Sequence, residues 1–164
     1  MAFFVTSTVV GTQPIADTST TQKHPLGTIV RAVDATLGEG EFIYLKGVAS
    51  TVVGSIVNYD DNYQTALDTA AVTGPSRPLA VAMSANVASQ YGWYQISGLA
   101  VATKANSVSF ADGAGLGSGS GLAVAVATGT VIQGAVVRTV ASAKSDVTTV
   151  KIAINRPHGP SDVS

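Results

Sequence analysis

Short runs in which apolar and polar residues alternate recur along the chain. In residues 149–154 branched apolar residues occupy every second position, so they share one side of an extended backbone. Residues 122–127 alternate large with small apolar side chains, a pattern that suits a strand covered on both faces. Apolar residues at helical spacing are nearly absent from windows of ten or more residues. The pattern therefore predicts an all-β fold.

Gly, Pro, Asn and Asp separate these runs, and together they indicate about nine or ten short strands. That number suits a compact β-sandwich or β-barrel. Residues 64–71 form the one segment where a short helix is conceivable, and their Thr and Asp content makes a loop at least as good an interpretation. Besides the two runs above, the expected strands are residues 27–33, 41–48, 55–59, 79–83, 93–102, 107–110 and 131–140.

The first 24 residues differ in character from the chain that follows. Apolar residues at the start precede a Thr-rich polar stretch, which predicts an extended N-terminal arm over residues 1–24, a single β domain over 25–157 and a short tail over 158–164. An apolar segment on such an arm, which we call the hook, cannot by itself offset the conformational entropy that it loses on becoming ordered. We expect it to dock on a neighbouring molecule, or to add a strand to one, through Phe3, Phe4, Val5 and Val9.

Two other segments stand out by composition. Residues 112–121 carry alternating glycines, which predicts either a mobile hairpin tip or a backbone pressed against another surface.

An aromatic cluster stands out in a chain with a single Trp and 6% aromatic residues; it consists of Tyr91, Trp93 and Tyr94. Such a cluster has three interpretations: core packing, a contact between subunits, or a platform on which sugar rings stack.

Composition narrows the function classes. Only 12% of the 164 residues are charged, which predicts a surface covered in part by other chains and hence a homo-oligomer. The formal net charge of −1 disfavours nucleic acid as a partner. The absence of Cys excludes disulfides, a thiolate nucleophile and metals ligated by Cys. No apolar run approaches the length of a membrane span, and no Lys or Arg precedes Lys23, which disfavours an export signal.

The titratable residues form no catalytic or metal-binding pattern. His24 and His158 both lie beside prolines, in segments expected to be loop or tail. Glu39 and Glu41 are expected to be solvated turn residues, and the acidic run at residues 60–62 lacks the Gly and Glu that complete a calcium loop. We therefore expect no enzyme activity, no cofactor and no metal site.

Several phrases of the sequence resemble small structural proteins of tailed bacteriophages, and in particular the capsid decoration, or cement, proteins. The phrases lie at residues 24–34 (HPLGTIVRAVD), 40–48 (GEFIYLKGV), 80–88 (AVAMSANVA) and 92–98 (GWYQISG). The resemblance covers most of residues 24–110 and carries no catalytic motif. It implies a β-rich homo-oligomer, often a trimer, on the outside of the phage head.

The leading hypothesis is therefore a structural virion protein that decorates the capsid exterior and bridges neighbouring major capsid subunits. It would be assembled in the host cytoplasm, with the major capsid protein and its own copies as partners, and without nucleic acid or membrane. The alternative is a carbohydrate-binding head-fibre or adhesin module, with Tyr91, Trp93 and Tyr94 as the stacking platform.

Overall fold

The chain folds entirely into β-strands and loops over the residues that the computed structural model describes, which are 4–5, 11–69, 76–106, 108–126, 131–138 and 148–159. This confirms the predicted all-β class. Ten strands form one sheet and two form another. The strands are β1 (Phe4–Val5), β2 (Thr18–Ser19), β3 (Ile29–Asp34), β4 (Gly38–Lys46), β5 (Ile56–Tyr59), β6 (Thr65–Leu67), β7 (Leu79–Ala82), β8 (Tyr91–Thr103), β9 (Gly117–Gly119), β10 (Leu122–Val124), β11 (Gln133–Val137) and β12 (Thr149–His158).

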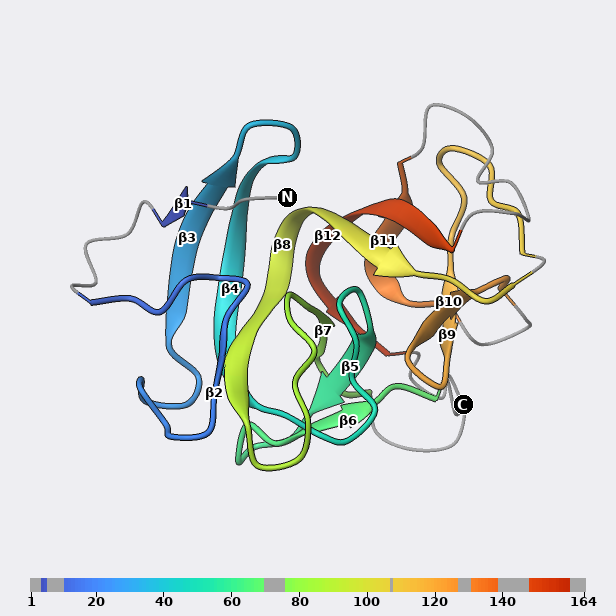
Figure 1. Ribbon diagram of the computed structural model, residues 1–164. Helices are drawn as coiled ribbons and strands as arrows, with labels where there is room; N and C mark the ends of the chain where they lie inside the picture. The colour runs from blue at the N-terminus through green and yellow to red at the C-terminus, as the bar shows by residue number, and fades with distance from the viewer. Residues whose placement is uncertain are drawn as a thin grey trace.

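The large sheet folds back on itself into a compact, sandwich-like body (Figure 1). Its strands follow the order β1-β3-β4-β8-β7-β5-β6, while β2 and β12 also pair with β8, and β11 pairs with β12. Neighbouring strands in this sheet run antiparallel. In Figure 1, β3 and β4 stand on the left and β11 and β12 on the right. The long strand β8 joins the two sides.

Strand β8 bends sharply at Gly98. Residues 91–97 pair with β4, and residues 97–103 pair with β12. Gly98 has a φ of +100°, which glycine adopts at no steric cost. A Cβ at this position would lie 2.5 Å from the carbonyl oxygen of Glu39. The bend, visible as the arch of the yellow ribbon in Figure 1, therefore depends on glycine and carries the sheet from one side of the molecule to the other.

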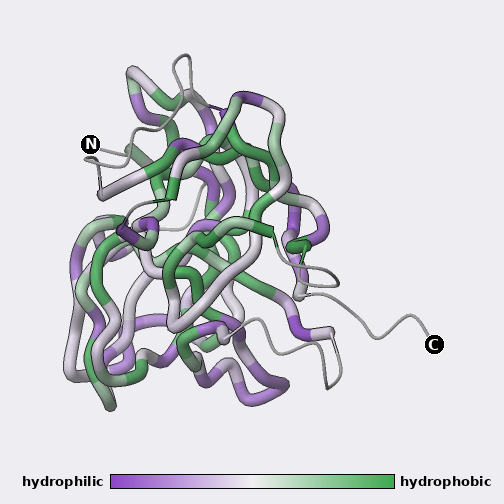
Figure 2. The backbone as a smooth tube through the Cα atoms, turned by 90° about the vertical axis from the view of Figure 1, so that its right-hand side faces the viewer, coloured by the Kyte–Doolittle hydropathy of each residue, from purple (hydrophilic) through white to green (hydrophobic). Residues whose placement is uncertain are grey.

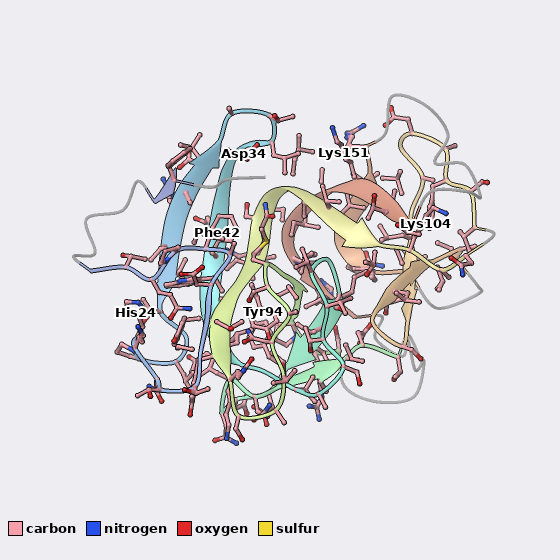
Figure 3. The ribbon with its side chains drawn as sticks, in the orientation of Figure 1. His24, Asp34, Phe42, Tyr94, Lys104 and Lys151 are labelled. Atoms are coloured by element: carbon pink, nitrogen blue, oxygen red, sulfur yellow. The ribbon has the colours of Figure 1, made fainter. Side chains whose placement is uncertain are left out.

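Three clusters of buried side chains fill the interior. One cluster packs on one face of β4 and β8, a second on their other face, and a third around β12 and the second half of β8. Figure 3 labels Phe42 of the first cluster and Tyr94 of the second. In Figure 2 apolar and polar stretches alternate along the backbone, and several polar stretches lie at outer turns. The largest fully buried side chains are Trp93, Tyr44, Tyr94, Phe42, Leu45 and Leu79.

Most of the predicted strands are confirmed, with two differences. The prediction of a strand at residues 107–110 is wrong for the described residues 108–110, none of which belongs to a strand element. Within residues 64–69 the chain forms the short strand β6, neither the helix nor the loop considered for residues 64–71. Thr65 on β6 is buried and its hydroxyl donates to the carbonyl oxygen of Lys46, which anchors β6 beside the end of β4.

The N-terminal segment differs from the predicted arm. Residues 11–24 lie against the sheet, where Ile15 is buried in the same cluster as Phe42 and Trp93. Thr18 and Ser19 pair with the start of β8. The expected boundary at residue 24 therefore does not separate an arm from a domain, because this segment covers one face of β4 and β8. At the other end, β12 runs through His158, the first residue of the predicted tail.

The alternating glycines of residues 112–121 form part of a tight hairpin. Strand β9 pairs with β10, and the two residues between them, Ser120 and Gly121, both have positive φ. This turn geometry matches the twist of the flanking strands. A Cβ at Gly121 would lie 2.8 Å from Cδ2 of Leu67, so the backbone is pressed against β6. Gly121 thus matches the second interpretation of this stretch, whereas no atom lies within 4 Å of a Cβ placed at Gly113.

Candidate functional site

Two of the three clustered aromatic residues belong to the core. The exposed fractions of Trp93 and Tyr94 are both 0%. They are neighbours on β8 and point to opposite faces of it, and each face is covered. Their predicted role in partner contact is therefore wrong for this fold, and so is a stacking platform that includes them. Tyr91, at the start of β8, remains partly exposed.

Trp93 belongs to a group of rings that holds the N-terminal segment. Its ring centroid lies 5.0 Å from that of Tyr44 and 5.4 Å from that of His24. His24 is buried, and its Nε2 accepts a 3.2 Å hydrogen bond from the backbone N–H of Gln13. The structure thus gives His24, which Figure 3 labels, a structural role in the body of the protein.

The predicted hook falls largely outside the described residues. Phe3 and Val9 lie there, and Val5 is described only as part of β1. Phe4 is 67% exposed and lies directly opposite Val33 in the pairing of β1 with β3. Because paired residues share a face, Phe4 and Val33 lie side by side on the surface.

An exposed apolar surface follows this edge of the sheet. Ile29 and Val33 lie four positions apart on the exposed face of β3, with Arg31 between them, and Phe4 extends the surface onto β1. We call these three residues the edge patch. Strand β1 is the last strand in the sheet order, so its outer edge has no neighbouring strand among the described residues. Sheet edges of this kind readily accept a strand from another chain.

A charged groove lies beside the edge patch. Arg31, between Ile29 and Val33, directs Nη2 to within 3.5 Å of Glu41 Oε1. Arg156 Nη2 donates a 2.9 Å hydrogen bond to Glu41 Oε2. Residues of β3, β4, β8 and β12 line this groove, whose volume is about 440 Å³.

Glu39 and Glu41 therefore differ in their surroundings. Both residues lie in strand β4 and not in the expected turn. The side chain of Glu39 is 61% exposed, as expected for a solvated residue, whereas that of Glu41 is 21% exposed and lies between two guanidinium groups. The expectation of a solvated residue is wrong for Glu41. The groove holds two arginines and two glutamates, so its formal charge is balanced.

Arg156 reaches Glu41 from a strained backbone. Its φ of +45° is unusual for a residue with a side chain. The pairing of β11 with β12 shifts register between Gln133 and Ala135, and the intervening Gly134 has a φ of +72°. Bulges of this kind redirect side chains. Here the side chain of Arg156, at the bulge, reaches Glu41, and this contact links β12 to β4.

A second hollow begins on the other side of Arg156. We call it the Tyr59 hollow; its volume is about 420 Å³. The buried residues Leu79, Ile96 and Pro157 contribute apolar lining. Burial raises the pKa of Tyr59 above its ordinary value near 10, and the nearby charge of Arg156 acts in the opposite direction. The residues that line the hollow are Tyr59, Ser76, Pro78, Leu79, Ile96, Arg156, Pro157 and His158.

Ser76 and His158 meet at the rim of this hollow. Ser76 Oγ lies 3.1 Å from His158 Nδ1, and it donates a 2.6 Å hydrogen bond to the carbonyl oxygen of Gly159. Because the hydroxyl hydrogen is directed at Gly159, His158 cannot act as the base that would activate Ser76 in this arrangement. The lining of the hollow includes neither Asp nor Glu. The pair is better suited to hydrogen bonding with a ligand than to nucleophilic catalysis.

Among the described residues, no three His, Cys, Asp or Glu side chains gather in a way that could hold a metal ion. A search of the same residues finds no helix that could cross a membrane. Comparison of the chain with protein-family models, curated proteins and solved structures finds no match.

Proposed function

We propose that this chain is an accessory structural protein of a tailed-phage capsid. It decorates the outside of the head and bridges neighbouring major capsid subunits, and it acts as a homo-oligomer, most simply a trimer. The proposal rests on the resemblance of residues 24–110 to decoration proteins and on the edge patch. It places the protein on the virion exterior, without nucleic acid or membrane as a partner.

The edge patch is the observation that carries the proposal. Phe4, Ile29 and Val33 are exposed together beside an open sheet edge. Full burial of a side chain of this kind contributes roughly 1.5–3 kcal/mol relative to full exposure, so each residue supplies about a tenfold to hundredfold change in affinity at most. A surface with apolar anchors and a charge-balanced margin has the composition of a protein interface.

The test uses virions of a tailed phage that encodes this chain, together with heads prepared without it. Wild-type protein and the double variant Phe4→Ser, Val33→Thr are added to such heads, and retention is measured after gradient centrifugation. The control is Val126→Thr, which changes an exposed valine outside the edge patch. We expect retention to fall at least tenfold for the double variant and to stay unchanged for the control.

Equal retention of the two variants would remove the edge patch from the proposal, and absence of the protein from virions would overturn the proposed function itself.

Attachment is expected to change little between about 50 and 500 mM salt, because apolar contacts are not screened and the groove is charge-balanced. A steep fall over that range would contradict apolar attachment.

The oligomeric state is tested separately by light scattering. We expect a species about three times the 16.5 kDa mass of one chain. A monomer at micromolar concentration would overturn self-association in solution.

A further inference from the structure

We propose that the Tyr59 hollow binds an acidic sugar, with the sugar ring on its apolar floor and the sugar carboxylate on Arg156. This site is distinct from the edge patch and shares no residue with the predicted platform of Tyr91, Trp93 and Tyr94. It would give the proposed virion protein an affinity for acidic glycans, but the binding itself is independent of any capsid.

The floor of the hollow suits the apolar face of a pyranose ring. Leu79, Ile96 and Pro157 are buried at its base, so the apolar surface that a ligand can reach comes mainly from Tyr59 and Pro78. Tyr59 is half-buried, so one part of its ring packs against the protein and another part faces the hollow. The C–H groups of a sugar can pack against such a tyrosine while the sugar hydroxyls stay hydrated or bonded.

Arg156 supplies the charge that selects an acid. The bond from its Nη2 to Glu41 uses one of the five N–H donors of the guanidinium group. Its position between the charged groove and the Tyr59 hollow gives it contacts with both. The bulge opposite Gly134 and the bond to Glu41 hold the side chain in place before a ligand arrives, which lowers the entropic cost of binding.

The remaining polar groups suit the hydroxyls of a sugar. A carbonyl oxygen only accepts hydrogen bonds, and Ser76 already donates to that of Gly159. His158 Nδ1, which lies within 3.2 Å of the same carbonyl oxygen, therefore carries a hydrogen in the neutral ring. This leaves Nε2 of His158 as an acceptor, while the Tyr59 hydroxyl can donate or accept.

A sugar fits this set of groups better than a simple aromatic acid does. An aromatic carboxylate would use the floor and Arg156 but would leave Tyr59, Ser76 and His158 without ligand partners. A neutral sugar would use those three residues but would make no ionic contact with the guanidinium of Arg156. An acidic pyranose offers hydroxyls and a carboxylate on one ring, so it engages all of them.

The experiment is a titration of the isotope-labelled protein, followed by the movement of its backbone amide signals in NMR spectra. The probes are glucuronic acid and N-acetylneuraminic acid, with glucose and benzoate as controls. We expect the two acidic sugars to bind with a Kd of about 1 mM, as is reasonable for ligands of this size. Glucose and benzoate should each bind at least tenfold more weakly.

Three variants and one control locate the site. Arg156→Gly removes the guanidinium and accepts the positive φ of this position, and Tyr59→Ala removes the ring. Arg31→Gln is the matched control, because Arg31 lines the charged groove and not the Tyr59 hollow. We expect the first two variants to weaken acidic-sugar binding at least tenfold and the control to change it less than twofold. Ser76→Ala, at an exposed position, keeps the test informative if Tyr59→Ala fails to fold.

The proposal is overturned if neither acidic sugar moves the amide signals, or if Arg156→Gly and Ser76→Ala both bind as the wild type does. Equal binding of glucose and glucuronic acid would overturn the role of Arg156. Since these measurements use the isolated protein, they succeed or fail independently of attachment to phage heads.

Discussion

The indole Nε1 of Trp93 donates a 3.0 Å hydrogen bond to the backbone carbonyl of Gln13, a residue 80 positions earlier in the chain. The bond joins the N-terminal segment to the central strand β8 near its start. Next to it, Ile15 packs on the same cluster as Trp93. The segment is therefore part of the core, and changes in it should alter the stability of the whole protein.

Replacing Ile15 with Ala should lower the free energy of unfolding by about 2–5 kcal/mol, because it leaves a cavity beside Phe42 and Trp93. The matched control is Ile29→Ala, which removes the same atoms from an exposed position. Urea unfolding curves of the two variants provide the comparison. Equal and small effects would show that residues 11–24 are a separable arm after all.

The backbone at Gly47 should not tolerate a methyl group. A Cβ there would lie 2.7 Å from Cβ of Asn86 and 3.0 Å from the carbonyl oxygen of Val87. We expect Gly47→Ala to cost about 1–3 kcal/mol through overpacking. Gly115→Ala is the control, because the nearest atoms to its Cβ lie at 3.6 Å. It should leave the thermal midpoint unchanged or slightly raised, and a comparable loss in both variants would contradict the packing argument.

Stability should fall in strongly alkaline solution because of Tyr94. Burial raises the pKa of this phenol above its ordinary value near 10, and the opposing effect of the hydrogen bond from Asn86 is smaller. As the pH rises past 10 the unfolded chain loses the proton first, so the stabilisation present below pH 10 is lost up to the higher pKa of the folded state.

Urea midpoints at about pH 7, 9 and 11 measure this effect. We expect the wild type to change little from pH 7 to 9 and to lose stability by pH 11. Tyr94→Phe should lose less over the alkaline interval, even if it is less stable at neutral pH. An identical alkaline loss in this variant would mean that other groups cause it.

The β9–β10 hairpin should depend on Asp68. Its carboxylate accepts hydrogen bonds from the Ser118 hydroxyl of β9 and, at 3.0 Å, from the Asn58 amide of β5. Asp68→Ala leaves these donors without their acceptor, at about 1–3 kcal/mol for each one that stays buried. Amide hydrogen exchange in residues 117–124 should accelerate more than in β4. Asp61→Ala, at an exposed position, is the control, and equal exchange in the two variants would contradict the link.

The fold class follows from the sequence because strands with a period of two carry their own signal, as residues 149–154 show. The path of residues 11–24 has no such signal. This Thr-rich stretch buries Ile15 and also attaches through hydrogen bonds such as that of the Gln13 carbonyl oxygen with Trp93. The partner in that bond lies on a strand far along the chain, so the sequence near residue 13 does not reveal it.

The candidate site was less accessible to sequence reasoning. Aromatic residues at positions 91, 93 and 94 indicate a strand but cannot show that both faces of it are covered. The pair of Arg156 with Glu41 joins residues 115 positions apart and depends on a bulge opposite Gly134. In the sequence His158 is only a residue beside prolines, and the sheet pairing places it with Arg156 at the hollow that Tyr59 also lines.

The position of β12 has a consequence for biosynthesis. Among the described strands, residues 98–103 of β8 pair only with residues 149–154, which are synthesised after their partner. Until then the nascent chain carries a long apolar strand with an open edge, which is a site for aggregation. Chains truncated before residue 149 are therefore expected to form insoluble fragments.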